Sequence, residues 1–412
     1  MVGVPSWAVD GRARLVTAAE ILAARQNVAG VIRVTPVERS ATLSQLCQRD
    51  VLLKQEHRQR TGSFKIRGAY HFVSNLPAEV TGIVAASAGN HAQGVALAAS
   101  LTGRRSTIFM PAAAALPKIE ATRAYGADVV LGQELVDECI TDAKAFALAT
   151  GSRFVPPFDD RLVIAGQGTL GLELAEEAPD AEVVLVPVGG GGLLAGVATA
   201  LAEARPQVRV VGVEPEGAAA MQASLVAGRP VALTDVHTIA DGIAVKSPSV
   251  LTLAHAQAFC DEVTTVSDAE IGRALVLLLE RSKMVVEPAG VVGLAALMAG
   301  KVAGDGPAVV VLSGGNVDPL MLIRLIEHGL TAAGRYLRLR IVVPDRPGAL
   351  ASITSVVAAL GLNVIEVAHQ RRGSMVDVDE VEVVFTLETR DPEHRLEVVS
   401  VLRQAGHVVD LL

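Results

Sequence analysis

One lysine stands in a setting that could support amine chemistry. Lys65 lies between Phe64 and Ile66 in the segment TGSFKIRG, beside a glycine and two hydroxyl residues, with no clear amphipathic period. A lysine in a turn is usually a solvated ammonium, and this is the ordinary interpretation. A lysine held away from water can instead lose its proton and form a Schiff base with a carbonyl compound. The remaining motifs decide between the two interpretations.

A run of four glycines could bind an anion. The sequence GGGG at residues 189–192 follows an apolar run that ends at Val188, and a helical stretch begins at Leu193. Glycines cost backbone entropy and offer no packing. Their bare N–H groups at a helix N-terminus can surround a phosphate, although a flexible turn is the alternative. The loop is not a P-loop, because no GK[ST] follows it.

Two further apolar runs end in polar residues. They are followed by SAGNHAQG at residues 87–94 and by SGGN at residues 313–316. Part of the first motif is ordinary helix capping, but exposed N–H groups there could bind a carboxylate, and Asn90 could bond a ring oxygen. A lone histidine is more often structural, so we assign His91 no catalytic role. Ser313 stands at a strand end and should face the same cleft.

A nucleotide-binding pattern occurs without its required context. Residues 166–171 read GQGTLG and match GxGxxG. In a dinucleotide fold an acidic residue ends the following strand, about twenty residues later. Here that strand ends in Pro187, Val188 and Gly189, so the sequence argues against an NAD-dependent oxidoreductase.

The elements that must position these motifs follow an α/β pattern. Short, non-alternating apolar runs suit strands buried on both faces of a parallel sheet. We expect them at residues 83–86, 106–110, 128–131, 183–188, 208–213 and 309–312. Helices are expected at residues 92–101, 116–125, 193–203 and 271–282. In such folds ligands bind at the carboxyl ends of the strands, where the motifs lie.

The pattern changes near His328, which predicts a second domain. Residues 329–335 suit a linker between a first domain at 1–330 and a second at 336–412. The second domain should contain a strand, a helix, two strands, a helix and a strand. We place them at residues 336–343, 349–360, 363–370, 381–388, 392–405 and 407–411. This βαββαβ order is the ferredoxin-like plan.

Composition limits the class of protein. Of 412 residues, 50% are hydrophobic and 19% are charged, and the net charge of −8 comes without a basic run. These values favour a compact protein and argue against a nucleic-acid partner. Three scattered cysteines without CxxC spacing argue against a disulfide framework or a zinc site. With no signal peptide or long apolar stretch visible, we expect a cytoplasmic protein with no membrane partner.

Taken together, SFKIRG, SAGNHAQG, GGGGL and SGGN resemble the motifs of pyridoxal-phosphate enzymes of the tryptophan-synthase-β fold type. The resemblance covers about residues 15–325 and is closest to the threonine ammonia-lyases, or threonine dehydratases. Residues 336–412 resemble an ACT domain, a regulatory amino-acid-binding module. The resemblance implies two α/β subdomains, with the smaller (about 55–155) inserted in the larger. It also implies a homo-oligomer, a dimer or a tetramer.

The resemblance further implies a role for each motif. Lys65 would hold pyridoxal 5'-phosphate as a Schiff base and later act as the base at the substrate α-proton. Asn90 would contact the ring oxygen, the glycine loop the phosphate, and Ser313 the pyridine nitrogen. The cofactor contacts would be Phe64, Lys65, Asn90, Gly189, Gly190, Gly191, Gly192, Leu193 and Ser313. The substrate carboxylate would be bound by Ser87, Ala88, Gly89, Asn90 and His91.

Other assignments depend on fewer residues. Arg67 would be the nearby cation that helps keep Lys65 deprotonated. Asp241 and Glu287 would assist the leaving group, or else serve as a buried cap or turn acceptor. An amino-acid effector would be bound at the first strand-to-helix turn of the ACT domain and the start of its second strand, by Asp345, Arg346, Gly348, Ala349, Leu350 and Asn363.

The implied reaction is elimination of the β-hydroxyl of L-threonine to give 2-oxobutanoate and ammonia, with L-serine giving pyruvate. It would serve isoleucine biosynthesis or threonine catabolism. Serine racemases carry a second serine as the opposite-face base, and Ala88 occupies that position here. Their cation ligands are a glutamate and an aspartate six residues later, but Ala220 follows Glu214, so we expect no metal. A serine or 3-hydroxyaspartate dehydratase remains open, and so does a non-catalytic amino-acid sensor, which intact Lys65 opposes.

Overall fold

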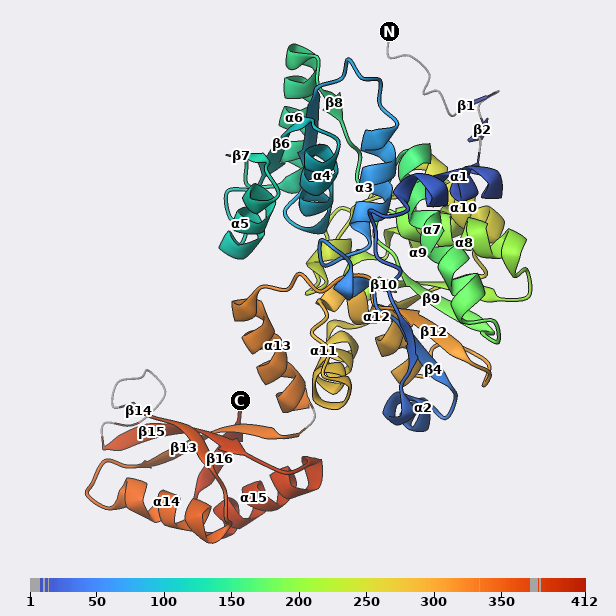
Figure 1. Cartoon of the computed structure of the whole chain (residues 1–412). Helices are drawn as coiled ribbons and strands as arrows, with labels where there is room; N and C mark the ends of the chain where they lie inside the picture. The colour runs from blue at the N-terminus through green and yellow to red at the C-terminus, as the bar shows by residue number, and fades with distance from the viewer. Residues whose placement is uncertain (1–7, 10–11, 14, 333, 371–376, 378) are drawn as a thin grey trace. The chain divides into compact units, whose positions relative to one another are not determined.

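The chain divides into two compact units, Met1–Met321 and Leu322–Leu412. The computed structural model describes residues 8–412 apart from 10–11, 14, 333, 371–376 and 378 (Figure 1). None of the described helices is long and apolar enough to cross a membrane. Helix α13 (Pro319–Ala332) contains the boundary between the two units.

A six-stranded sheet forms the larger part of the first unit, in the order β11-β10-β9-β12-β4-β3. Neighbouring strands are parallel except β3, which is antiparallel to β4. The bounds are β3 Val37–Arg39, β4 Val51–Lys54, β9 Val183–Pro187, β10 Arg209–Pro215, β11 Glu262–Val266 and β12 Ala308–Val311. Strands β9 and β12 are buried along their whole length, as the apolar runs predict.

A four-stranded parallel sheet, β7-β6-β5-β8, forms the smaller part of this unit. Its strands are β5 Gly82–Ala86, β6 Arg105–Met110, β7 Asp128–Leu131 and β8 Arg153–Phe154. Helices gather around it in Figure 1: α3 Lys65–Ser74, α4 Asn90–Leu101, α5 Leu116–Ala124 and α6 Val136–Thr150. Apolar side chains such as Phe72, Val95 and Ile108 form the core between sheet and helices.

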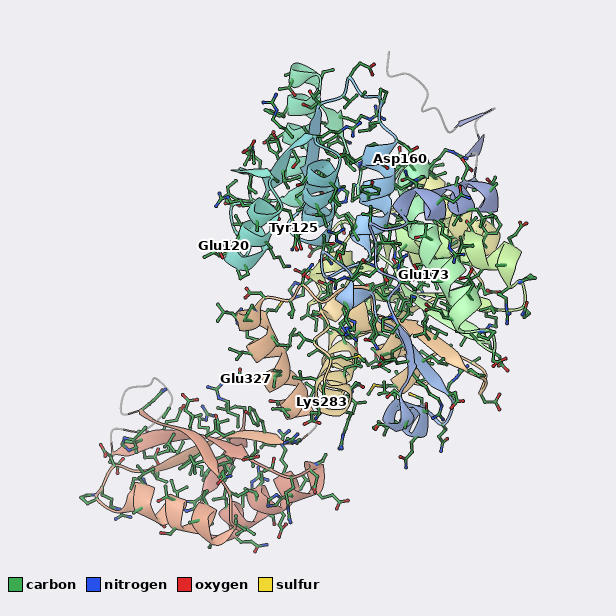
Figure 2. The ribbon with its side chains drawn as sticks, in the orientation of Figure 1. Glu120, Tyr125, Asp160, Glu173, Lys283 and Glu327 are labelled. Atoms are coloured by element: carbon green, nitrogen blue, oxygen red, sulfur yellow. The ribbon has the colours of Figure 1, made fainter. Side chains whose placement is uncertain are left out.

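The remaining helices of the first unit pack around the six-stranded sheet. They are α1 Ala18–Val28, α2 Ala41–Cys47, α7 Arg161–Glu177, α8 Gly192–Ala204, α9 Ala220–Ala227, α10 Val250–Phe259, α11 Asp268–Leu277 and α12 Pro288–Met298. Short elements are the hairpin β1 Ala8–Val9 and β2 Arg12–Ala13, the 3-10 turns η1 Glu56–Arg58, η2 Glu216–Ala218 and η3 Asp241–Ile243, and the π-turn η4 Leu278–Ser282. In Figure 2, Glu173 of α7 lies in the interior, whereas Glu120 of α5 is exposed.

The GQGTLG motif lies in the middle of α7 and not in a strand-to-helix turn. A Cβ atom at Gly166 would lie 2.6 Å from the Cα atom of Gly68 on α3. A Cβ atom at Gly168 would lie 3.0 Å from the carbonyl oxygen of Gly196 on α8. The glycines therefore let α7 approach two neighbouring helices closely, which explains the motif without a nucleotide.

The second unit has the predicted βαββαβ order, with an antiparallel sheet β14-β15-β13-β16. Its elements are β13 Tyr336–Pro344, α14 Ala349–Ala359, β14 Val364–Gln370, β15 Glu380–Glu388, α15 Pro392–Gln404 and β16 Val408–Leu411. Both helices lie on one face of the sheet (Figure 1). On β13, alternate residues Leu337, Leu339 and Ile341 are buried beneath them.

The linker predicted at residues 329–335 is wrong in its first part, because α13 continues to Ala332. Apolar residues recur at helical spacing at Leu322, Leu325, Ile326 and Leu330, and this pattern favours a helix through Gly329.

Candidate active site

The predicted site residues of the first unit line one cavity of about 670 Å³. They lie after the carboxyl ends of β5, β9 and β12 and at the start of α3, and two lie in η3 and before α12. The lining includes Phe64, Lys65, Ser87, Ala88, Gly89, Asn90, His91, Gly189, Gly190, Gly191, Gly192, Leu193, Asp241, Glu287 and Ser313. Parallel strands explain why segments far apart in the chain converge at one edge.

Lys65 is the first residue of helix α3 and does not lie in an irregular turn. Ile66, Ala69, Phe72 and Val73 form the buried face of this helix, with the expected helical spacing. The segment TGSFKIRG showed no such period because the helix begins only at its fifth residue. The sequence motif therefore identified the lysine but not the element that carries it.

Burial lowers the pKa of the Lys65 amine from 10.5 to about 8, and the carboxylate of Glu287 partly opposes the shift. Its Nζ atom donates a hydrogen bond of 3.0 Å to the carbonyl oxygen of Pro157. The prediction that Arg67 is the responsible cation is wrong. The guanidinium of Arg67 is fully buried elsewhere, in ion pairs with Glu56 and Glu173. Desolvation, and not a neighbouring cation, favours the neutral amine.

The glycine loop between β9 and α8 has little space for side chains. Gly191 precedes α8 with a φ of +88°, in the left-handed region that favours glycine. A Cβ atom at Gly190 would overlap the ring of Phe158, and one at Gly189 would lie 3.0 Å from the Cα atom of Ile243. No side chain caps α8, so the N–H groups of its first turn are available to an anion.

Asn90 is held from both sides. Its Nδ2 atom donates to Oε1 of Glu287 at 2.6 Å, and its Oδ1 atom accepts from Nδ2 of Asn316 at 2.8 Å. Asn316 also donates to the carbonyl oxygen of Thr61 at 2.7 Å, and a carbonyl can only accept. These bonds fix the orientation of both amides and connect the segments around Lys65, Asn90 and Ser313.

The loop from Ser87 to His91 presents its backbone to the cavity. The Ser87 hydroxyl accepts a hydrogen bond from the N–H of Gly89 at 3.1 Å. Burial, with a smaller effect of Lys65, lowers the pKa of His91 to about 3, so its imidazole is neutral. Nε2 of His91 donates to the carbonyl oxygen of Val155 at 3.0 Å, which accounts for this histidine structurally. The N–H groups at the start of α4 remain for an anionic ligand.

Two acidic residues lie in different surroundings. Burial, followed by the charge of Asp241, raises the pKa of Glu287 to about 7. Asp241 is half-exposed and forms an ion pair of 2.8 Å with Lys118. A carboxyl that is neutral near pH 7 can donate a proton as well as accept one, so Glu287 suits acid–base chemistry better than Asp241 does.

These features fit a flat ring that carries a phosphate group and an aldehyde. Ser313 is almost fully buried and lines the cavity, and no hydrogen-bond partner for its hydroxyl occurs among the described residues. The glycine loop provides a space without Cβ atoms, and a deprotonatable lysine lies within the same cavity. A ring nitrogen, a phosphate and a carbonyl carbon would satisfy these three features.

The lining or supporting residues that sequence reasoning missed include Lys118, Pro157, Phe158 and Asn316. Asn316 belongs to the motif SGGN, so its position in that motif was a usable signal. Lys118 and the pair Pro157–Phe158 reach the site only through tertiary packing, and their local sequence carries no pattern that indicates it.

Glu214 has a structural explanation. Its two carboxylate oxygens accept hydrogen bonds from the N–H groups of Met221 and Gln222, both at 2.8 Å, near the start of α9. Within the described parts of the chain, no group of three or more His, Cys, Asp or Glu residues could hold a metal ion.

The predicted effector residues of the second unit do not come together in one chain. Asp345, Arg346, Gly348, Ala349 and Leu350 follow the carboxyl end of β13, and Gly348 has a φ of +93°. Asn363 donates instead to Glu388 at 3.1 Å, beside the amino end of β13. A nine-residue strand separates the two positions, a span of about 25 Å. One small ligand cannot touch both within a single chain.

Comparison with known proteins identifies both units. The profile of the family "Pyridoxal-phosphate dependent enzyme" matches residues 28–314, and that of "ACT domain" matches residues 337–406. L-threonine ammonia-lyase of Geobacter sulfurreducens is 46% identical over 92% of this chain and 96% of its own length. The Thermotoga maritima enzyme of the same name is 44% identical over 97% of this chain and 100% of its own length. The structure of threonine deaminase isoform 2 from Solanum lycopersicum matches with a TM-score of 0.72 and 39% identity, covering 76% of this chain and 86% of that one. The chain therefore belongs to the family of pyridoxal-phosphate dependent enzymes and carries an ACT domain as its second unit.

Proposed function

We propose that this protein deaminates L-threonine to 2-oxobutanoate and ammonia, and L-serine to pyruvate, by α,β-elimination. The observation that carries the proposal is the Lys65 amine, with its lowered pKa, in one cavity with a glycine loop, Asn90 and Ser313. The names of the two bacterial relatives support threonine as the substrate. Ala88 lines the same cavity and offers no base for racemisation.

The residues of the chain would divide the work as follows. The N–H groups of residues 189–193 bind the phosphate, Asn90 and Ser313 orient the ring, and the loop at 87–91 binds the substrate carboxylate. Pyridoxal phosphate, when bound, supplies an electron sink for the negative charge at the substrate α-carbon. The Lys65 amine, with its lowered pKa, lines the same cavity and would take the α-proton of the substrate. Glu287 lies in the same cavity and can give a proton to the departing hydroxyl.

The proposal extends to regulation and assembly. The ACT unit would bind an amino acid at the turn formed by residues 345–350 and change the affinity for threonine. Because Asn363 lies at the other end of β13, a ligand that touches both would bind between two copies of the chain. The proposal includes a homo-oligomer located in the cytoplasm, and the separation of the effector residues supports the oligomer.

The decisive experiment is Lys65→Ala with threonine as substrate. The variant should lose the visible absorption of the lysine-bound cofactor and the formation of 2-oxobutanoate, measured in a coupled assay. The control is Lys144→Ala, which removes an exposed lysine outside the cavity and should retain both signals. A colourless Lys65→Ala protein with normal turnover would refute the mechanism. Normal colour with no turnover of any hydroxy amino acid by the unmodified enzyme would refute the substrate.

A further inference from the structure

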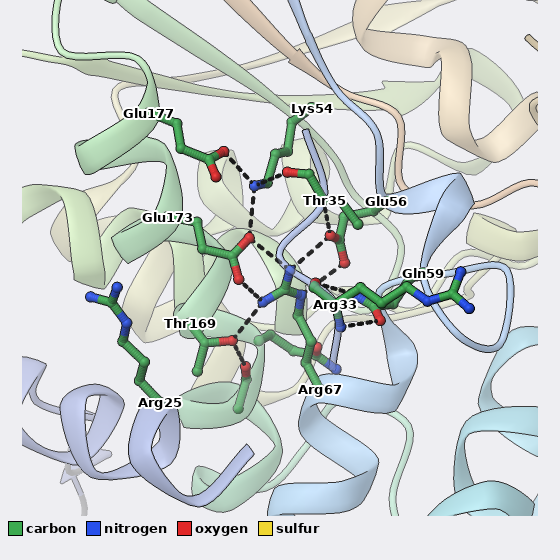
Figure 3. Close-up of polar contacts among 12 residues, drawn as sticks. Arg25, Arg33, Thr35, Lys54, Glu56, Gln59, Arg67, Thr169, Glu173 and Glu177 are labelled. Carbon is green, nitrogen blue, oxygen red and sulfur yellow. Dashed lines mark hydrogen bonds and ion pairs between the residues drawn. The ribbon is translucent and has the colours of Figure 1, made fainter. Parts of the chain in front are cut away.

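A network of buried charges lies behind the first turn of α3 (Figure 3). Arg67, fully inaccessible to solvent, is its centre. Its guanidinium forms paired hydrogen bonds to both oxygens of Glu56, at 2.8 Å each, and to both oxygens of Glu173, at 2.7 and 2.9 Å. A fifth bond of 3.0 Å reaches the hydroxyl of Thr169. All five N–H donors of this arginine are therefore used.

The network joins α3 to elements of the larger sheet. Glu56 lies in η1, directly after β4, and Glu173 and Thr169 lie on α7. Lys54, the last residue of β4, extends the network by contacting Glu173 at 2.7 Å and Glu177 at 2.8 Å. Only Glu177 in this group is appreciably accessible to solvent. Helix α3 is thus tied through one side chain to the turn after β4 and to α7.

Arg67 and Lys65 point in opposite directions from the same helical turn. Side chains two positions apart in an α-helix point in directions that differ by about 200° around the helix axis. One of them therefore faces the cavity when the other faces away. Close backbone contacts also limit how this turn can move. A Cβ atom at Gly94 of α4 would lie 3.2 Å from the carbonyl carbon of Lys65, and one at Gly166 of α7 would lie 2.7 Å from the carbonyl oxygen of Arg67. These contacts restrict displacement of the turn but do not fix its rotation.

We propose that Arg67 is a positioning residue for Lys65: its paired bonds to Glu56 and Glu173 fix the rotation of the first turn of α3 and so direct the lysine amine into the cavity. The inference rests on the proposed role of Lys65 as the reacting amine. Residues 61–64 are tied to the SGGN segment, where the N–H of Phe64 donates to the carbonyl oxygen of Ser313 at 3.1 Å. These bonds end before Lys65, and no side chain caps the start of α3. The competing explanation is that the network only stabilises the fold.

The first test replaces Arg67 by methionine, which is unbranched and carries no charge. Glu56 then remains buried without its ion-pair partner, and Glu173 keeps only Lys54, so the thermal midpoint should fall by roughly 5–10 °C. We expect kcat to fall roughly tenfold to hundredfold with KM changed little, because misplacement of a reacting group affects the chemical step. A readout independent of turnover is the rate at which cofactor-free protein regains visible absorption when pyridoxal phosphate is added. This rate should fall by a similar factor.

The second test separates position from stability. The triple variant Arg67→Met, Glu56→Gln, Glu173→Gln removes the cation and both carboxylates, and leaves Lys54 paired with Glu177. Replacing a complete buried network usually restores stability, in contrast to breaking it. If Arg67 positions Lys65, the thermal midpoint should recover while kcat and the cofactor reattachment rate stay low. Recovery of kcat and reattachment together with the thermal midpoint would overturn the proposal.

Two further variants serve as a rescue and a control. Arg67→Lys keeps the charge but supplies three donors in place of five and no planar fork, so kcat should remain below that of the unmodified enzyme. Full rescue by lysine would show that charge alone is required and would contradict the proposal. Glu177→Gln changes the same network at its accessible end without touching Arg67, and should leave kcat and reattachment unchanged. If the enzyme acts on another substrate, the reattachment rates still test the inference.

Discussion

At the scale of single residues, burial changes the protonation of two groups that share the cavity. It lowers the pKa of Lys65 to about 8 and raises that of Glu287 to about 7. Both groups therefore titrate close to neutral pH, where a proton can pass to or from substrate at small energetic cost. The two shifts have the same main cause, since each charged form loses its hydration.

The shift of Glu287 predicts a pH dependence of stability. Its folded pKa of about 7 lies above the ordinary glutamate value of 4.5, so the folded protein holds the proton more tightly. The resulting stabilisation is complete below pH 4.5 and is lost as the pH rises through 7. It amounts to about 3 kcal/mol for a shift of this size. The glutamine in Glu287→Gln cannot titrate. Between pH 5 and 8 the thermal midpoint of the cofactor-free variant should therefore rise relative to that of the unmodified protein.

Parallel thermal melts of the two proteins across this pH range give the measurement. A constant difference between them would show that Glu287 keeps an ordinary pKa. Asp410→Asn is a suitable control, because Asp410 is exposed and lies in the other unit. The difference in thermal midpoint between Asp410→Asn and the unmodified protein should not grow between pH 5 and 8.

Sequence reasoning located Lys65, Asn90, Ser313 and the glycines at the cavity because each lies in a short motif. The motifs other than that of Lys65 follow strand ends. It assigned the lowered lysine pKa to Arg67 because the two residues are neighbours in sequence. In a helix, side chains two positions apart diverge, and only the structure reveals that Arg67 begins a separate network. The hydrogen bond between Lys65 and Pro157 joins residues 92 positions apart in the sequence. No local sequence pattern at either residue indicates it.

At the scale of elements, the loop between β9 and α8 depends on the absence of side chains. A methyl group at Gly190 would overlap the Phe158 ring, which lines the same cavity. Gly190→Ala should therefore weaken cofactor binding, and overpacking of this kind typically costs about 1–3 kcal/mol. The measurement is a cofactor titration followed by visible absorption.

The matched control is Gly132→Ala. No atom lies within 4 Å of a Cβ atom built at that position, and its φ is not in the left-handed region. Cofactor affinity should be unchanged in this variant. Equal affinity in both variants would mean that the loop does not enclose the phosphate.

A search for apolar runs found most strands of the six- and four-stranded sheets of the first unit but missed the buried interior strand β4, which is only four residues long. The strands β5, β6, β7, β9, β10 and β12 all coincide with the predicted apolar runs. Strand β11 was missed because it is an edge strand that reads EVTTV, with only two buried residues. Strand β3 was missed for a similar reason, being three residues long with none buried. Edge strands need less apolar composition, so a search for apolar runs finds an edge strand such as β7, which reads DVVL, but misses β11 and β3.

At the scale of the whole molecule, the ACT unit should make catalysis responsive to an amino acid. We expect isoleucine or valine to shift the threonine saturation curve of the full-length enzyme. A coupling of about 1–3 kcal/mol would change the affinity roughly 5- to 150-fold. Removal of residues 336–412 should abolish the shift and preserve turnover at Lys65. The measurement is threonine kinetics of both proteins with a panel of amino acids.

The control is a compound that is similar to the effectors but does not bind the ACT unit. It should shift the threonine saturation curve of neither protein. If no amino acid moves the curve of the full-length enzyme, the regulatory part of the proposal fails and the catalytic part stands. If the truncated enzyme keeps the shift, the effector binds elsewhere in the first unit.

The position of β4 in the larger sheet has a consequence for biosynthesis. Residues 51–54 of β4 pair with residues 308–311 of β12, about 250 positions later in the chain. At roughly 5–20 residues per second, a ribosome needs on the order of 12–50 s to make the intervening segment. During that time the smaller sheet, complete by residue 154, can already fold. Strand β4 still lacks its parallel partner β12. The Lys65 segment follows β4 directly, so the nascent enzyme acquires its reactive lysine geometry only near the end of synthesis of the first unit.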